Sequence, residues 1–174
     1  MALIVEDGSI VAGAESYASV LTATAYLNAR GKSTWADLDQ DVKEAKLRIA
    51  TDTMTQLYRN RWYGTRVSLI QSLDWPRYNV QRPDAIGYAR GYLAVYPYNV
   101  VPAEIANACI ELAYRASTGL DLNPDTTASI KEEKIGPLTT VYERGSIGVT
   151  KFRAVDNMLF PFISGANFAR VVRA

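Results

Sequence analysis

The stretch VPAEIANACIELAYRASTG, residues 101–119, decides the fold more than any other part of the chain. Pro102 stands at the first turn of a predicted helix, where a missing backbone N–H costs nothing, and Gly119 stands where the helix should end. Apolar side chains recur between them at helical spacing: Ile105, Ala108, Cys109, Leu112, Ala113 and Ala116. The pattern predicts a helix with one apolar side, and we expect it to lie at the centre of the core.

Two further helices are predicted before residue 60. Ser19 has the side chain of an N-cap for a helix over residues 20–30, and Gly31 is placed to end it. Asp39 can cap a longer helix that runs to about Tyr58. We expect an apolar stripe along this second helix at Val42, Ala45, Ile49, Met54, Leu57 and Tyr58. The charged positions between them, among them Lys43, Glu44, Lys46, Arg48 and Asp52, are expected mostly on a solvated face.

The rest of the chain reads as extensions of one helical domain over residues 19–164. Residues 1–18 predict an extended N-terminal arm or a small hairpin, because an Asp-Gly turn signal joins two short apolar runs. Residues 130–142 predict two short strands or extended arms, and residues 165–174 a C-terminal tail. The expected fold class is therefore mostly α: a small helical bundle with an N-terminal arm, a short β-hairpin or extended arm, and a tail.

Composition excludes several classes of protein. The 174 residues are 48% apolar and 21% charged, which is ordinary for a folded globular domain. Nineteen basic and 18 acidic residues leave a formal charge of +1, so any nucleic-acid binding must come from a local patch. No apolar stretch approaches the length of a membrane span, and we expect no membrane partner.

The residues needed for the common kinds of catalysis are missing. The chain has no histidine and a single cysteine, Cys109, which excludes Ser-His-Asp and Cys-His systems and a His-containing or multi-Cys zinc site. No glycine-rich phosphate-binding motif occurs. The carboxylates at Asp37, Asp39, Asp41 and Glu132 fall in turns or at a helix start, where capping explains them. We therefore predict no enzyme activity, no cofactor and no metal.

Residues 59–101 show no periodicity and many Gly and Pro, so we expect an irregular segment with ordered contacts. Arginines and aromatic rings alternate in it: Arg59, Arg61, Arg66, Arg77, Arg82 and Arg90 with Trp62, Tyr63, Trp75, Tyr78 and Tyr88. Such a mixture would suit single-stranded nucleic acid, with arginines on phosphates and rings on bases. Trp, Tyr and Arg also dominate protein interfaces, and the balanced total charge favours that interpretation.

Four residues of this segment are the candidates for subunit or DNA contacts: Arg59, Arg61, Trp62 and Arg66. In the interface interpretation, the tryptophans anchor a core or interface and the arginines pair with carboxylates of a neighbouring subunit. Pro76 restricts the geometry of the residue before it, so Trp75 is expected to be buried in a rigid turn.

Several short motifs, in their order and spacing, resemble one family over nearly the whole chain. They are Val5 to Ser9, Ala14 to Tyr17, the helix end at Arg30-Gly31, Trp35, Trp62 to Arg66, Gln71 to Arg77, Val101-Pro102 and Lys134 to Leu138. The chain is similar to phage proteins described as putative DnaT-like single-stranded-DNA-binding proteins, which in turn resemble the head-tail connector, or adaptor, proteins of tailed phages. The tyrosines of residues 78–100 are not part of the resemblance.

The resemblance implies a virion protein of the phage neck, assembled in the host cytoplasm, that acts as a head-tail connector. Copies would form a ring, typically twelvefold, under the portal protein and extend the channel for double-stranded DNA toward the next neck or tail component. The tail residues expected to bind the portal are Phe168, Arg170, Val171, Val172 and Arg173. The alternative is a DnaT-like single-stranded-DNA-binding replication accessory protein.

Overall fold

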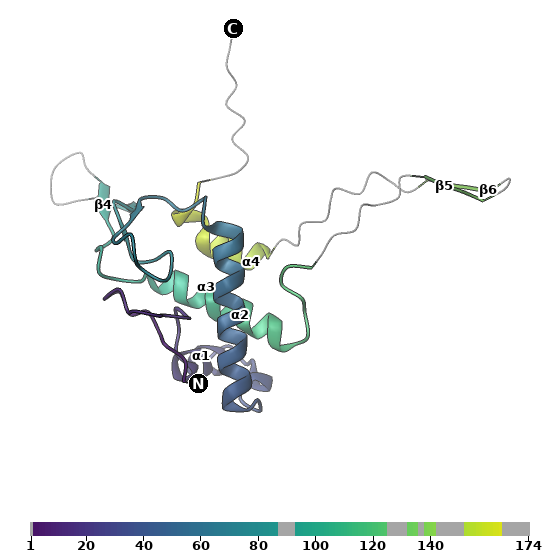
Figure 1. Ribbon diagram of the computed structural model, residues 1–174, viewed down its shortest axis with the longest axis horizontal. Coiled ribbons are helices and arrows are strands. Elements are labelled where there is room, and N and C mark those ends of the chain that lie inside the picture. The colour runs from purple at the N-terminus through teal and green to yellow at the C-terminus, as the bar shows by residue number, and fades with distance from the viewer. Residues whose placement is uncertain (1, 87–92, 125–131, 136–137, 142–151, 165–174) are drawn as a thin grey trace, which may run out of the picture.

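The computed structural model describes residues 2–86, 93–124, 132–135, 138–141 and 152–164, and it is mostly helical, as predicted (Figure 1). The helices are α1 (Val20–Asn28), α2 (Gln40–Tyr58), α3 (Ala103–Ser117) and α4 (Arg153–Leu159), with 3-10 turns η1 at Ser33–Trp35 and η2 at Phe160–Phe162. The strands pair in small two-stranded antiparallel sheets. None of the described helices is long and apolar enough to cross a membrane.

Helix α3 is the centre of the core, which confirms the prediction from residues 101–119. It packs against α2, α1 and α4, and α2 crosses it in Figure 1. Every apolar residue of the predicted stripe is buried, and so are Ile110 and Glu111 on the rest of its surface. Burying an aliphatic side chain such as Ile105 or Leu112 stabilises the fold by roughly 1.5–3 kcal/mol.

Helix α2 has the predicted length but buries a different face. The buried positions are Glu44, Leu47, Ala50, Thr51, Thr53, Met54 and Tyr58. Val42 and Ile49, expected on the apolar stripe, are exposed. Each lies two positions from a buried residue, which rotates it by roughly 200° around the helix to the opposite side. The stripe prediction is therefore correct at Met54 and Tyr58, and Leu57 is partly buried. It is wrong at Val42, Ala45 and Ile49, which are exposed, and Glu44 is buried although it was expected on the solvated face.

Helix α1 begins and ends close to the predicted positions. The Ser19 hydroxyl accepts a hydrogen bond from the backbone N–H of Thr22 at 3.1 Å, so the predicted N-cap is confirmed. Ala23 and Leu27 point into the core. At the start of α2, Asp39 occupies the N-cap position without a side-chain capping bond.

The segment between α2 and α3 is more regular than predicted. Strands β1 (Thr65–Arg66) and β2 (Arg77–Tyr78) pair with each other, as do β3 (Gln81–Ile86) and β4 (Leu93–Val95). The chain then returns to the body, where the Tyr96 backbone N–H donates to the Val80 carbonyl at 2.9 Å. Short pairings of this kind escape detection by periodicity because each strand is only two to six residues long.

Two segments outside the helices were predicted as extensions: the N-terminal residues and residues 130–142. Val5 and Ser16 form a bridge that turns the first residues into a closed loop. Strands β5 (Glu132–Ile135) and β6 (Leu138–Val141) form the antiparallel pair expected within residues 130–142, and Figure 1 shows this pair apart from the helices. The predicted C-terminal tail, residues 165–174, lies outside the described residues.

Candidate nucleic-acid interface

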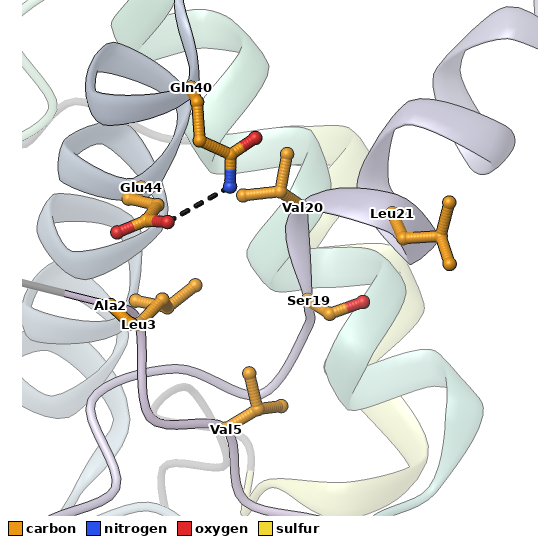
Figure 2. A pocket seen from close by; sticks show the side chains of 8 residues that line it. All are labelled: Ala2, Leu3, Val5, Ser19, Val20, Leu21, Gln40 and Glu44. Atoms are coloured by element: carbon orange, nitrogen blue, oxygen red, sulfur yellow. Dashed lines mark hydrogen bonds between the residues drawn. The ribbon is translucent and has the colours of Figure 1, made fainter.

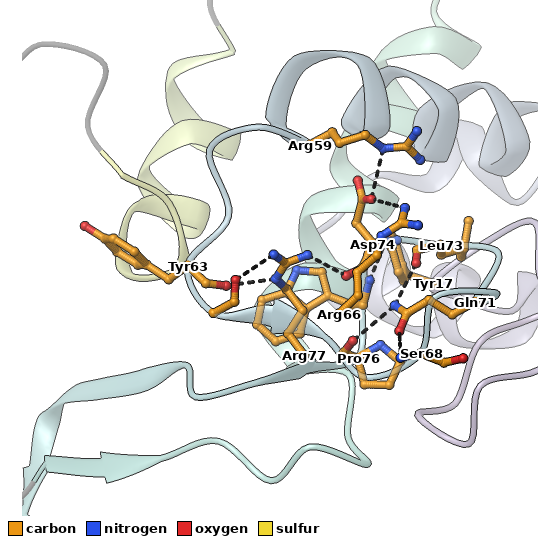
Figure 3. Close-up of polar contacts among 12 residues, drawn as sticks. Tyr17, Arg59, Tyr63, Arg66, Ser68, Gln71, Leu73, Asp74, Pro76 and Arg77 are labelled. Carbon is orange, nitrogen blue, oxygen red and sulfur yellow. Dashed lines mark hydrogen bonds and ion pairs between the residues drawn. The ribbon is translucent and has the colours of Figure 1, made fainter.

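The carboxylate of Asp74 joins two of the predicted contact residues. Its Oδ1 atom lies 3.0 Å from Nε of Arg59 and 2.6 Å from Nη2 of Arg66 (Figure 3). The Asp74 side chain is 1% exposed, whereas the Arg59 side chain is 50% exposed. These two arginines therefore use part of their hydrogen-bonding capacity within their own chain.

Backbone and side-chain hydrogen bonds hold the turn around Asp74 in place. The Tyr17 hydroxyl accepts from the backbone N–H groups of Asp74, at 3.0 Å, and Trp75, at 3.4 Å. Burial, followed by the nearby Asp74 charge, raises the pKa of this phenol, so it stays protonated. The buried Gln71 amide donates to the carbonyls of Leu73 and Pro76, as Figure 3 shows. The turn is thus a fixed part of the core.

Arg77 binds only backbone oxygens in this cluster. Its Nε atom donates to the Tyr63 carbonyl at 2.8 Å, Nη2 to the Gly64 carbonyl at 2.8 Å, and Nη1 to the Asp74 carbonyl at 3.1 Å. The residue is buried, so its guanidinium cannot follow a phosphate backbone. Its hydrogen bonds therefore join the turn at Tyr63–Gly64, before β1, to the turn at Asp74, before β2.

The tryptophans of the segment are buried in a row of aromatic rings. Trp62 packs edge-on against Trp75 with ring centroids 5.8 Å apart, and Trp75 packs edge-on against Phe162 at 5.5 Å. Tyr58 lies on the other side of Trp62. Edge-to-face pairs of this kind stabilise a core by about 0.5–1.5 kcal/mol beyond the area they bury. The prediction that Trp75 is buried is confirmed, and its ring is inaccessible to a base.

The four sequence-predicted contact residues do not share one environment. Arg59 and Arg66 meet at Asp74, Trp62 is in the core, and the Arg61 guanidinium lies 5.4 Å from the centre of the Tyr58 ring. Their role in subunit or DNA contacts stays a prediction. The portal-binding candidates Phe168, Arg170, Val171, Val172 and Arg173 lie outside the described residues.

A group of exposed tyrosines lies next to this cluster. The sequence places two of them, Tyr63 and Tyr78, among the alternating arginines and rings, but they are not among the four predicted contact residues. Tyr63, Tyr78 and Tyr98 are exposed, and the rings of Tyr78 and Tyr98 lie 5.0 Å apart. Figure 3 shows Tyr63 pointing away from the Asp74 cluster. We call these three residues the tyrosine surface. Exposed apolar side chains that lie in contact, as the Tyr78 and Tyr98 rings do, are typical of interaction sites.

A hollow of about 310 Å³ lies beside Tyr63. It is lined by Tyr63, Gly64, Asn79, Gln81 and Pro161. The lining thus includes an aromatic ring and two amide side chains, which offer a stacking face and hydrogen-bonding groups of the kind that recognise an unpaired base.

The pairing of β1 with β2 positions these residues. Thr65 pairs with Tyr78 and Arg66 with Arg77, so Arg77 points inward and Tyr78 outward. Gly64, with φ +69°, sits so close to the Tyr78 carbonyl that no Cβ fits between them. On the other side, the Tyr63 backbone N–H donates to the Phe162 carbonyl at 2.9 Å. The strand pairing, which has no signal in the sequence, is what turns Tyr78 toward solvent.

Arginines supply positive charge near the tyrosine surface. The Arg82 guanidinium lies over the Tyr96 ring, 4.9 Å from its centre, and the Arg82 side chain is exposed. Arg59 and Arg66 are partly exposed near the neighbouring turn. The acidic residues near Tyr96 are Asp84 and Glu104. Together with Asp74, which pairs with Arg59 and Arg66, these carboxylates balance the charge of the three arginines.

The described residues hold no group of His, Cys, Asp and Glu side chains that could bind a metal. Cys109 is fully buried, and burial raises the pKa of its thiol. Its sulfur lies 3.3 Å from the Thr51 hydroxyl, as expected for a small core side chain.

A model of one protein family matches residues 1–174, which is the whole chain; its description is "Putative DnaT-like ssDNA binding protein". No curated protein and no solved structure matches the sequence. The description names a type of ligand and does not say which residues bind it.

Proposed function

The chain belongs to the family of putative DnaT-like single-stranded-DNA-binding proteins, and we propose that it binds single-stranded DNA through the tyrosine surface. The observation that carries this proposal is the set of exposed rings beside a hollow with amide side chains. Bases of a single strand would stack on Tyr63 and on the Tyr78–Tyr98 pair, while phosphates would lie near Arg82. Each stacked base contributes about 1–3 kcal/mol in other single-strand binders.

The near-zero net charge of the chain limits the electrostatic contribution to DNA binding. With a formal charge of +1, the chain has no strong field that draws DNA from a distance. Stacking would therefore supply most of the affinity, and a few arginines the salt dependence. Duplex DNA offers no free base faces, so it should bind far more weakly than a single strand.

The test is fluorescence anisotropy of a labelled oligo(dT) strand and of the matching duplex. We expect the Tyr63→Ala, Tyr78→Ala double variant to weaken single-strand binding by roughly tenfold or more, since stacking is lost. The matched variant Tyr63→Phe, Tyr78→Phe keeps both rings and should bind like the wild type. Unchanged binding by the alanine variant would refute the tyrosine surface as the site, and no binding by the wild type would refute the function.

A second candidate is the head-tail connector that the order of sequence motifs suggests. It is favoured by two aliphatic side chains that face solvent almost completely, Leu69 at 98% and Ile70 at 92% exposure. Side chains of this kind are typical of contacts between proteins. In this role the chain would form a ring under a portal protein, and the tail of residues 165–174 would bind the portal.

The two candidates use different parts of the molecule, so they can be tested separately. Deleting residues 165–174 should abolish neck assembly of a connector while leaving binding of oligo(dT) unchanged. Particles that assemble normally with the truncated chain would contradict portal binding by the tail. Absence of the chain from mature particles would contradict the connector role altogether.

A further inference from the structure

Two amide side chains line the hollow beside Tyr63. This hollow has a volume of about 310 Å³ and is lined by Tyr63, Gly64, Asn79, Gln81 and Pro161, and we call it the Tyr63 hollow. We propose that the amides of Asn79 and Gln81 bind the hydrogen-bonding edge of one unpaired base, the edge that faces the opposite strand in a duplex. This inference rests on the proposed single-strand binding and adds to it a contact that stacking does not provide.

The lining of the Tyr63 hollow is uncharged. None of its five residues is acidic or basic. A phosphate that entered the hollow would lose water without gaining an opposite charge, which is costly. The bases are the neutral and planar parts of a DNA strand, so the hollow suits a base and leaves the phosphates outside.

The backbone beside the hollow has little hydrogen-bonding capacity left for a ligand. The carbonyls of Tyr63 and Gly64 each accept from Arg77 at 2.8 Å, and the Tyr63 N–H donates to the Phe162 carbonyl at 2.9 Å. By contrast, the exposed side chains of Asn79 and Gln81 make no hydrogen bond within the part of the chain that the structure describes. A base in the hollow would therefore find its partners in these two amides.

The backbone under the two amides is held in place. Asn79 and Gln81 stand on either side of Val80, which is fully buried and accepts a hydrogen bond from the Tyr96 N–H at 2.9 Å. Gln81 also pairs with Val95 across β3 and β4. Asn79 has φ +58°, a left-handed conformation that Asn tolerates better than most residues with a side chain. Groups that are positioned beforehand lose less conformational entropy on binding.

The chemistry of an amide matches the edge of an unpaired base. Each amide offers an NH₂ donor beside a carbonyl acceptor. On its Watson–Crick edge every base also has a donor next to an acceptor, which in thymine are N3–H and a ring carbonyl. In a duplex the opposite base occupies these groups. The contact would therefore favour single strands for a reason that is independent of stacking, and it would tolerate any base sequence.

Two other hollows of the molecule have a different lining. The hollow in Figure 2, of about 230 Å³, has aliphatic side chains such as Leu3, and its Gln40 amide donates to Glu44 at 2.9 Å. A hollow along α2 is lined by charged side chains, among them Arg48 and Asp52. No aromatic residue lines either of them. The Tyr63 hollow differs from both because it combines a ring with unpaired amides.

A strand whose bases keep their faces but lose this edge tests the contact. In oligo(N3-methyl-dT), a methyl group replaces the N3 hydrogen of every thymine, so the donor is lost while the ring can still stack. Modification at every position prevents the protein from moving to an unmodified base. In fluorescence anisotropy, the wild type should bind this strand roughly fivefold or more weakly than oligo(dT), the change expected for one lost hydrogen bond.

The Asn79→Gly, Gln81→Ala double variant assigns the effect to the two amides. Both side chains are exposed, and Gly adopts the left-handed φ of residue 79 without strain, so the variant should fold. It should bind the two strands equally, about as weakly as the wild type binds the methylated strand. The control Asn28→Ala removes an exposed amide at the end of α1, outside the Tyr63 hollow, and should keep the discrimination of the wild type.

The outcomes separate this inference from the proposed function. A wild type that binds the two strands equally well would overturn recognition of the base edge and leave stacking on the tyrosine surface intact. Discrimination that persists in the double variant would overturn the assignment to Asn79 and Gln81. A wild type that binds neither strand would refute single-strand binding and this contact with it.

Discussion

Arg66 places its Nη2 atom 2.6 Å from Oδ1 of Asp74, a carboxylate that is almost completely shielded from water. The contact joins β1 to the turn before β2, and Arg59 adds the end of α2 to the same oxygen. A segment with no periodicity in sequence is thereby fixed to the helical core. The tyrosine surface and the exposed Leu69 and Ile70 belong to this segment.

The first prediction concerns Asp74 itself. Replacing it with Ala leaves two guanidinium groups without their shared carboxylate, and we expect a loss of about 2–3 kcal/mol in the free energy of unfolding. This is less than the roughly 3–5 kcal/mol for a fully buried pair, because both arginines keep contact with water. Arg59→Ala should cost about 1 kcal/mol or less. Urea unfolding followed by the fluorescence of the buried tryptophans measures both, and equal effects would contradict this account.

The second prediction concerns Gly64. Ala at this position combines a left-handed backbone with a clash against the Tyr78 carbonyl. Gly31 has the same φ of +69° but open space around it, so Gly31→Ala measures the backbone strain alone. We expect about 1–2 kcal/mol for Gly31→Ala and clearly more for Gly64→Ala. The melting temperatures of the two variants measure this difference. Equal destabilisation would mean that the backbone at Tyr78 can move to accommodate the added methyl group.

The third prediction concerns the pH dependence of stability. Burial alone would raise the pKa of Glu111, but hydrogen bonds and charges from Lys32 and Arg115 outweigh it and hold the pKa below its ordinary 4.5. Lys32 Nζ lies 2.7 Å from both carboxylate oxygens. Because the folded-state pKa is lowered, this contribution to stability is complete above about pH 4.5 and is lost as the pH falls through the folded value.

Glu111→Gln tests this assignment. The variant should be less stable than the wild type at neutral pH, and the difference should shrink as the pH falls below about 4.5. Urea unfolding curves of both proteins across this range give the difference directly. A difference that stays constant with pH would mean that the ion pairs with Lys32 and Arg115 do not contribute in solution.

Local signals were enough to predict the helices. The Ser19 cap predicts where α1 begins, because a capping hydrogen bond involves only the first turn of a helix. The apolar positions of α3 predict the central helix, because a 3.6-residue period places them all on one face. The same reasoning failed on α2. Val42 and Ile49 have the spacing of a buried stripe, yet the helix turns Leu47 and Glu44 toward the rest of the protein. Which of two amphipathic faces is buried depends on the neighbouring segments.

The candidate site was harder to predict for the same reason. Arginines and tryptophans of residues 59–77 have the composition of a binding surface, but Asp74 and the backbone carbonyls use Arg66 and Arg77 internally. Tyr63 and Tyr78, on either side of these arginines in the sequence, are exposed instead. Arg77 and Tyr78 are adjacent, and only pairing across β1–β2 determines that the first is buried and the second faces water.

The fourth prediction separates phosphate contacts from base contacts. If Arg82 binds a phosphate, Arg82→Ala should reduce the slope of log affinity against log salt by about 0.7, the value for one contact on a single strand. Tyr98→Ala should weaken binding of oligo(dT) at every salt concentration and leave the slope unchanged, since stacking releases no counterions. Anisotropy titrations at several salt concentrations give both slopes. An unchanged slope for Arg82→Ala would remove this residue from the DNA path.

The last prediction concerns Glu6, which organises the N-terminal loop. Its carboxylate is 2% exposed and accepts hydrogen bonds from the backbone N–H groups of Gly8 at 2.8 Å, Ile10 at 3.0 Å and Val11 at 3.0 Å. Both oxygens are used. Gln offers one acceptor oxygen and a donor NH₂ group, so Glu6→Gln turns a donor toward at least one backbone N–H.

We expect Glu6→Gln to lower the free energy of unfolding by about 1–3 kcal/mol, the usual penalty for a buried group left unpaired. Amide hydrogen exchange at Ile10 and Val11 should become faster, because the loop can then open without global unfolding. Asp7→Asn is the matched control: Asp7 accepts from the Ser9 N–H at an exposed position, so exchange at Val11 should hardly change. Equal exchange in the two variants would show that the loop is held by its apolar contacts and not by the Glu6 carboxylate.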